Sequence, residues 1–131
     1  MSELIGKYER VSCDGLKEAY EGSSEVEMSC MVAEAPATLI LNKEFGLWTL
    51  EVKVGDISNR VSFREGRQEV GGGREVVVVE EKDMLNIVVK KYGIEVINTI
   101  LELVQDGEIV QTTYLPMAGS QGKIVERFCK K

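Results

Sequence analysis

The chain has 131 residues, of which 44% are hydrophobic and 29% are charged. This length and composition predict one globular domain, residues 1–131, and exclude a disordered chain. The net charge is −6 and there is no long basic run, so we expect no binding to nucleic acid or to anionic membranes. No apolar run approaches the length of a membrane-spanning helix, so we also expect no stable membrane insertion.

The three cysteines, Cys13, Cys30 and Cys129, are odd in number and widely spaced. This pattern is typical of reduced thiols rather than of a disulfide framework. The first six residues lack the basic and apolar segments of a secretion signal. Together these features predict a cytoplasmic protein.

The chain begins with a predicted strand at 6–13, followed by the one segment with helical spacing, residues 14–35. Apolar residues recur every three or four positions from Leu16 to Tyr20 and again from Met28 to Ala35. Pro36 prevents continuation of the second helix. The pattern predicts a helix-turn-helix, and two interpretations stay open: a lid over a cavity, or a hairpin that packs on a sheet, which periodicity alone favours.

From residue 37 onward the sequence predicts strands joined by short turns, with Asp106-Gly107 the strongest hairpin signal. The segment 66–73 is polar and rich in glycine, with a flexible tip at Gly71–Gly73. The total is about ten strands, which predicts an all-β antiparallel meander, closed or nearly so. The expected strands after the lid are 37–43, 47–54, 58–64, 74–80, 84–90, 94–104, 108–115 and 123–131.

The final strand should lie beside the first and seal the sheet. Alternation alone does not decide which of its two faces points inward. The faces are Val125, Arg127 and Cys129, or Ile124, Glu126 and Phe128. Either choice brings a charge into the interior, where it is costly without a partner, so the charge is a candidate binding group.

Arg127 is the first candidate, and Glu102 and Arg10 are the others. Each could instead be a solvated residue on the outer face. If these charges share the interior, a pair of Arg127 or Arg10 with Glu102 would offset much of the desolvation cost.

Catalysis is not expected from this inventory of residues. The sequence has no histidine, no Gly-x-Ser-x-Gly elbow and no glycine-rich loop that opens a helix. The cysteines lack an imidazole to activate them, and no spacing of His or Cys suggests a metal site. We therefore expect neither an enzyme nor a metal or cofactor site.

The order of these features resembles the intracellular lipid-binding family, which includes fatty-acid-binding and cellular retinoid-binding proteins. The resemblance covers nearly the whole chain. It rests on Gly6-Lys7-Tyr8, the helical hairpin, Pro36, the stretch from Val61 to Glu69, Asp106-Gly107 and the ending Arg127-Phe128-Cys129-Lys130.

This resemblance implies an all-β fold of the calycin type, a ten-stranded antiparallel up-and-down β-barrel with the helix-turn-helix lid after its first strand. In this family two interior arginines and a tyrosine often bind a ligand carboxylate. Arg127 matches the arginine of the family's final Arg-x-Tyr, Cys129 falls at the tyrosine, and Glu102 falls at the other arginine. A ligand carboxylate would thus meet a nearly neutral pair. We hypothesise that Arg127 and Glu102 pair across the cavity and favour a neutral or hydroxylated ligand, or a fatty acid held by apolar contact.

The implied function is non-covalent binding and transport of a hydrophobic ligand, such as a long-chain fatty acid, a retinoid or a related lipid, by a monomer. Delivery through free solution is expected, because the second helix is acidic. The alternative is a barrel with an occluded cavity that acts as a protein-interaction or structural protein, and a secreted lipocalin is disfavoured. The expected ligand-binding residues are Arg127, Cys129, Glu102, Leu16, Tyr20, Met28, Pro36, Ile57 and Arg10.

Overall fold

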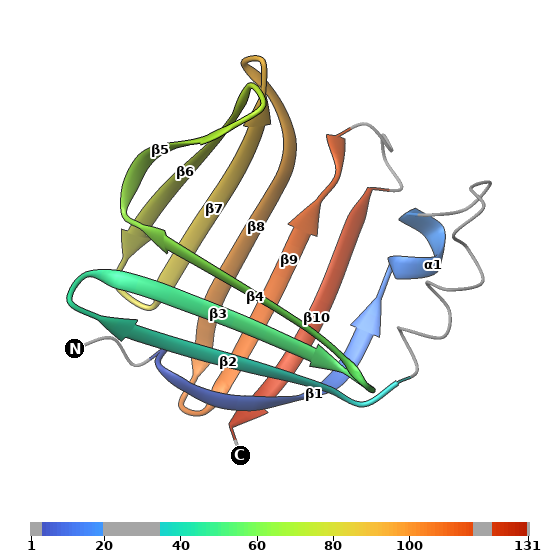
Figure 1. Cartoon of the computed structure of the whole chain (residues 1–131). Helices are drawn as coiled ribbons and strands as arrows, with labels where there is room; N and C mark the ends of the chain where they lie inside the picture. The colour runs from blue at the N-terminus through green and yellow to red at the C-terminus, as the bar shows by residue number, and fades with distance from the viewer. Residues whose placement is uncertain (1–3, 20–34, 117–121, 131) are drawn as a thin grey trace.

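The computed structural model describes residues 4–19, 35–116 and 122–130, which form ten antiparallel strands and a short helix (Figure 1). The strands are joined mainly by tight turns, as the glycine-containing pairs between them predict. The elements are β1 (Gly6–Asp14), α1 (Leu16–Ala19), β2 (Ala37–Glu44), β3 (Leu47–Val54), β4 (Ile57–Arg64), β5 (Gly66–Gly71), β6 (Arg74–Glu81), β7 (Met84–Lys91), β8 (Ile94–Gln105), β9 (Glu108–Tyr114) and β10 (Lys123–Lys130).

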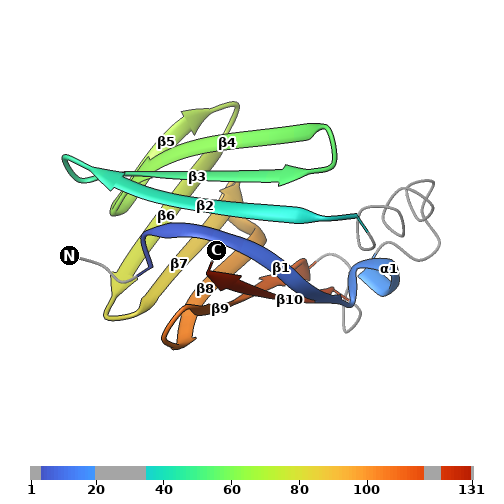
Figure 2. The same ribbon diagram turned by 90° about the horizontal axis from the view of Figure 1, so that it is seen from below.

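The strands form one sheet in the order β4-β3-β2-β1-β10-β9-β8-β7-β6-β5. β1 pairs with β10, so the two ends of the chain join the halves of the sheet, as predicted (Figures 1 and 2). β4 and β5 are the two edges of this order and share no ladder of hydrogen bonds. The sheet is therefore a nearly closed barrel, and the all-β antiparallel prediction is confirmed.

Two parts of the prediction need correction. The glycine-rich segment 66–73 contains a strand, β5, with an irregularity in its ladder with β6 between Glu69 and Gly71. Pairing with the valine-rich β6 holds this segment extended although glycine has low strand propensity. The helix-turn-helix lid predicted for residues 14–35 is also not supported. The described part of that segment contains one short helix, α1, and residues 20–34 lie outside the described residues.

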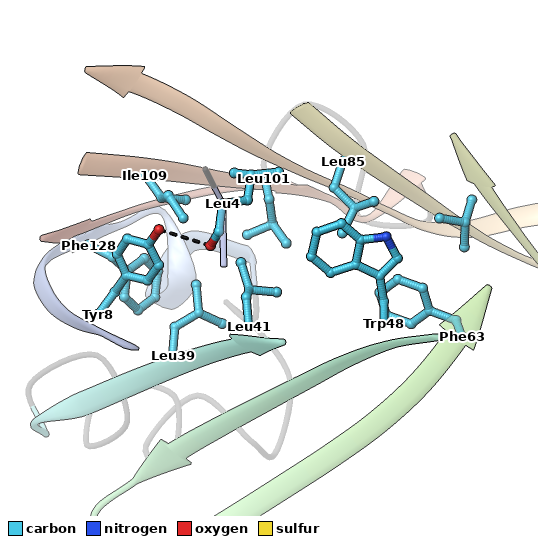
Figure 3. Packing of buried hydrophobic residues seen from close by; sticks show 11 residues of the cluster. Leu4, Tyr8, Leu39, Leu41, Trp48, Phe63, Leu85, Leu101, Ile109 and Phe128 are labelled. Carbon is cyan, nitrogen blue, oxygen red and sulfur yellow. Dashed lines mark hydrogen bonds between the residues drawn. The ribbon is translucent and has the colours of Figure 1, made fainter. Parts of the chain in front are cut away.

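Large side chains fill one region of the barrel. Trp48, Tyr8 and Phe128 are almost fully buried, and the Tyr8 hydroxyl donates a hydrogen bond to the carbonyl oxygen of Leu4 at 2.9 Å (Figure 3). Leucines from both halves of the sheet pack around them. This cluster is a conventional packed core, and it closes one side of the barrel interior. Its other members are Leu39, Leu41, Phe63, Val78, Leu85, Leu101 and Ile109.

Candidate functional site: the barrel interior

A cavity of about 370 Å³ lies inside the barrel, bounded by strands β3 to β9. Its wall is mostly apolar. The wall is formed mainly by every second residue of each strand, because side chains alternate between the two faces of a sheet. In β6, for example, Val76 lines the cavity while Val77 has the opposite orientation. The lining residues are Leu50, Val61, Ser62, Phe63, Val70, Val76, Ile87, Val89, Ile97, Thr99 and Gln111.

Several apolar side chains of this wall remain exposed. Val61 retains 53% of its accessible surface and Val70 also retains 53%, although both line the cavity. In a filled core, side chains at such positions would be almost fully buried. These valines lie on β4 and β5, the two edge strands, so the cavity is open rather than filled on this side of the barrel.

An arginine and a glutamate form an ion pair inside the barrel. Arg10 Nη1 lies 2.9 Å from Glu126 Oε2, and their side chains are only 5% and 16% exposed. Arg10 Nη2 also donates to the carbonyl oxygen of Ala35 at 2.7 Å. The pair bridges β1 and β10 at the strand seam, where an irregularity between Arg10 and Ser12 changes the alternation of β1. Because the two charges have opposite sign, their sum is zero.

Gln111 connects this ion pair with the cavity. Its Nε2 donates to Glu126 Oε1 at 3.4 Å, and Gln111 is itself part of the cavity wall. Gln111 Oε1 is buried and has no hydrogen-bond partner among the described residues. A buried acceptor without a partner costs about 1–3 kcal/mol.

Cys13 stands opposite Glu126 in the ladder between β1 and β10. Burial raises the pKa of its thiol to about 11, with the negative charge of Glu126 as the next contribution. The thiolate is the reactive form of cysteine, so this thiol is poorly suited to nucleophilic chemistry. Within the described ranges no group of acidic, histidine or cysteine side chains could hold a metal ion.

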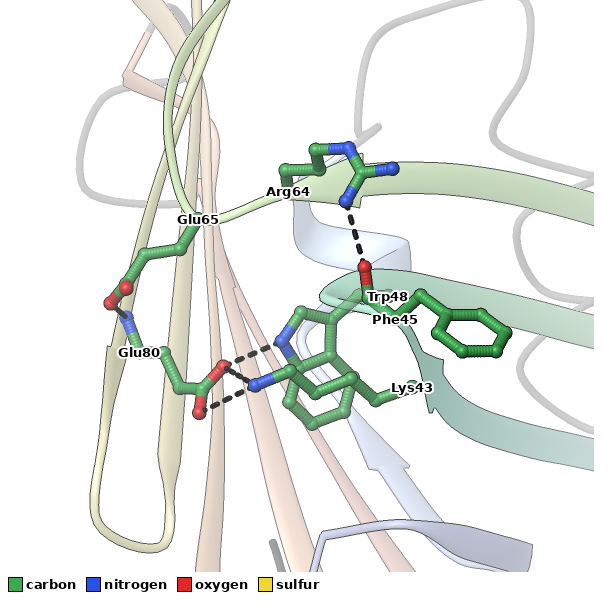
Figure 4. Close-up of polar contacts among 6 residues, drawn as sticks. All are labelled: Lys43, Phe45, Trp48, Arg64, Glu65 and Glu80. Atoms are coloured by element: carbon green, nitrogen blue, oxygen red, sulfur yellow. Dashed lines mark hydrogen bonds and ion pairs between the residues drawn. The ribbon is translucent and has the colours of Figure 1, made fainter. Parts of the chain in front are cut away.

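A second polar cluster joins the two halves of the barrel near the open edge. Glu80 of β6 accepts hydrogen bonds from Lys43 Nζ and from Trp48 Nε1, both at 2.8 Å, and Lys43 lies over the Trp48 ring at 5.3 Å (Figure 4). The Glu80 amide in turn donates to Glu65 Oε2 at 3.1 Å. These contacts link β2 and β3 to β6 although these strands are not neighbours in the sheet.

The Lys43–Trp48–Glu80 cluster predicts a pH-dependent stability. The hydrogen bond from Lys43 lowers the pKa of Glu80, more than burial raises it, with a further lowering by Trp48. A carboxyl with a lower pKa in the folded state stabilises it above the unfolded pKa of about 4.3. This stabilisation is lost as the pH falls through the folded pKa. We expect the unfolding free energy to differ most between wild type and Glu80→Gln above about pH 4.3, and the difference to shrink below it.

Urea unfolding over a pH series measures this difference. Glu81→Gln is the matched control, because Glu81 is exposed on the same strand. The cluster would have no part in acid stability if the Glu80→Gln difference stayed constant with pH or matched that of Glu81→Gln.

The structure corrects the predicted orientation of Arg127. Its side chain is 52% exposed and pairs with Glu108 on the outer face, with Nη1 and Oε1 3.2 Å apart. The inward face of β10 is instead that of Ile124, Glu126 and Phe128, with Ile124 and Phe128 buried. Burying an isoleucine and a phenylalanine outweighs burying Val125 and Cys129.

The other predicted residues are divided between the two faces and the rim. Cys129 and Glu102 are exposed, so neither meets Arg127 inside the barrel and the proposed Arg127–Glu102 pair is wrong. Arg10 does lie inside. Ile57 shares the face of Phe63 on β4 but is 60% exposed at the strand's end.

Of the four remaining residues that we predicted to bind ligand, the structure describes two. Leu16 is half-buried on α1, and Pro36 is exposed with its carbonyl oxygen accepting a hydrogen bond from the Gly55 amide. Tyr20 and Met28 lie outside the described residues.

Sequence reasoning missed Gln111 and did not single out Glu126. A comparison of the apolar surface on the two faces of the final strand could have identified Glu126 as inward, because it lies between Ile124 and Phe128. Gln111 gives no such signal, since its neighbours Val110 and Thr112 make either orientation acceptable.

Searches of solved structures find barrels that match along almost the whole chain. The fluorescent protein UnaG matches with a TM-score of 0.76 and 20% identity, over 98% of each chain. The apo form of Caenorhabditis elegans lipid binding protein 8 matches with a TM-score of 0.78 and 17% identity, over 98% of this chain and 96% of the other. The REP1-NXSQ fatty acid transporter matches with a TM-score of 0.73 and 14% identity, over 98% and 96%.

The chain has the fold of these three proteins. Identities of 14 to 20% make this a likeness of fold, and it agrees with the barrel that the sequence resemblance implies. A scan against protein-family models finds no match, and a search of curated proteins finds none. No helix in the described part of the chain has the length and hydrophobicity needed to span a bilayer.

Proposed function

We propose that this protein binds a hydrophobic small molecule non-covalently in the barrel cavity. The observation that carries the proposal is the hollow of about 370 Å³ with a mostly apolar wall and three polar residues, Ser62, Thr99 and Gln111. Thr99 and Gln111 belong to neighbouring strands. Ligand sites are typically cavities of about 300–1,000 Å³ with mostly apolar walls and a few polar groups that fix orientation.

The names of two structural neighbours support a lipid as the ligand. One is a fatty acid transporter and another is a lipid binding protein. A lipid with a long apolar chain and one polar end fits a cavity that is apolar along most of its wall. We extend the proposal to carriage of such a lipid by a cytoplasmic monomer that catalyses no reaction.

The alternative, a structural or interaction protein with an occluded interior, is less well supported. It requires side chains to fill the space behind Val61 and Val70, yet both remain half exposed.

Native mass spectrometry of the protein as expressed tests the proposal. We expect a fraction of the protein to carry one lipid, which organic extraction should release for identification. Val61→Trp, which places an indole in the cavity, should abolish the retained lipid. Val79→Trp, on the outer face of β6, is the matched control and should keep it. Protein without any adduct that also fails to take up a neutral hydrophobic dye would refute the proposal.

A further inference from the structure

We propose that the cavity selects lipids whose polar end is neutral and donates a hydrogen bond, such as a long-chain alcohol, over lipids that end in a carboxylate. This inference rests on the proposed function and names the class of ligand. It follows from the chain of contacts Arg10–Glu126–Gln111 and from the cavity wall beside it.

Arg10 and Glu126 balance each other's charge at this end of the cavity. Arg10 is nearly fully buried and its guanidinium is in contact with the Glu126 carboxylate at 2.9 Å. A guanidinium engaged in this way has less to offer a second anion, and the pair adds no net charge to the interior. A ligand carboxylate placed at this end would bring an uncompensated negative charge close to Glu126. Such a charge is costly in a low-dielectric interior.

The Gln111 side-chain amide is oriented by Glu126. A carboxylate can only accept hydrogen bonds, so the amide nitrogen of Gln111 turns toward Glu126. The amide oxygen then has no partner in the described residues and is buried beside the cavity that Gln111 lines. Glu126 therefore orients the Gln111 amide so that its oxygen is the group left to accept a hydrogen bond at this end of the cavity.

The Gln111 amide oxygen needs a hydrogen-bond donor, and a ligand hydroxyl is one. When the Gln111 side chain turns its buried amide oxygen toward the cavity, a terminal hydroxyl can donate to Oε1 and accept in turn from the Thr99 hydroxyl, which belongs to the same wall. An ionised carboxylate has no proton to donate and leaves the amide oxygen unsatisfied. An ester is neutral but also lacks a donor, so it separates the effect of charge from that of hydrogen bonding.

The test compares oleyl alcohol, methyl oleate and oleate as competitors of Nile red at neutral pH. We expect the alcohol to bind about tenfold more tightly than oleate, because oleate lacks the hydrogen bond to the buried acceptor and also brings an uncompensated charge. Methyl oleate should bind several-fold more weakly than the alcohol. Affinity for oleate that equals or exceeds affinity for the alcohol would overturn the inference.

Glu126→Gln supplies the decisive variant. It preserves the shape of the side chain, removes one negative charge from the interior and frees the Gln111 amide to turn over. We expect oleate to bind at least tenfold more tightly to this variant than to wild type, so that the preference reverses. Glu108→Gln is the matched control, because Glu108 also pairs with an arginine but on the outer face, and it should change neither affinity. Identical behaviour of the two variants would refute the role of Glu126.

Gln111→Leu tests the same inference if Glu126→Gln does not fold. Removing the amide should weaken binding of the alcohol several-fold, to the level of methyl oleate, and leave oleate unchanged. An unchanged affinity for the alcohol would contradict the inference. Failure of all three lipids and of Nile red to bind wild type would instead overturn the proposed function, and the inference with it.

Discussion

Replacement of Arg10 by methionine is expected to lower the free energy of unfolding by about 3–5 kcal/mol. The methionine keeps much of the side-chain volume but leaves the Glu126 carboxylate inside the barrel without its guanidinium partner at 2.9 Å. The loss also removes a hydrogen bond to the Ala35 carbonyl oxygen. Urea unfolding of the purified variant measures the change. A domain of this size has a total stability of about 5–15 kcal/mol, so much of the variant could be unfolded at physiological temperature.

The outer ion pair provides the control for this prediction. Arg127 and Glu108 have a comparable separation of 3.2 Å, but the Arg127 side chain is 52% exposed. Arg127→Met should therefore cost at most about 1 kcal/mol. In the double variant Arg10→Met/Glu126→Leu the buried charge is absent, and most of the lost stability should return. Equal effects of Arg10→Met and Arg127→Met would show that the two arginines have been assigned to the wrong faces.

Replacement of Trp48 by alanine should have an effect of similar size. Trp48 is fully buried in the packed core, and its indole also donates a hydrogen bond to Glu80. Truncation of a buried tryptophan to alanine costs about 3–5 kcal/mol through lost apolar contact and the cavity left behind. Because the ring contacts the cluster that joins β2 and β3 to β6, the loss should also weaken the link between the halves of the barrel.

Two further variants separate the contributions of Trp48. Trp48→Phe retains a large ring and loses the donor to Glu80, so its cost should be about 1–2 kcal/mol. Phe45→Ala is the control, because Phe45 is 93% exposed and should change the stability by less than about 0.5 kcal/mol. Alanine has a Cβ as phenylalanine does, so the substitution at position 45 does not alter the backbone requirements of the turn. A Trp48→Ala variant as stable as Phe45→Ala would contradict the description of the core.

The strand content of this fold was predictable because local signals agree with one another. Alternating apolar residues in β3, the Asp106-Gly107 turn and the β-branched run of β6 each predict extended structure. β5 was not recognised, because its glycines and charged residues lack that pattern and its conformation depends on pairing with β6. Tertiary hydrogen bonding decided this segment against local propensity.

The orientation of the candidate site was predicted less well, for a physical reason. A change of one position along a strand moves a side chain from the interior to the solvent. Reading Arg127 as the inward residue of β10 therefore displaced Glu126, which is the residue that meets Arg10. The irregularity in β1 between Arg10 and Ser12 adds a second change of alternation that no sequence period reveals.

The run of four valines in β6 offers the most direct test of a ligand inside the barrel. Val76 lines the cavity, as does Val89 on the paired strand β7, while their neighbours Val77 and Val88 face the other side of the sheet. With methyl-labelled protein saturated with unlabelled oleyl alcohol, we expect intermolecular nuclear Overhauser effects at Val76 and Val89 and none at Val77 and Val88. Binding accompanied by contacts at Val77 and Val88, and none at Val76 and Val89, would place the ligand on the outer surface and contradict the proposal of a cavity that binds lipid.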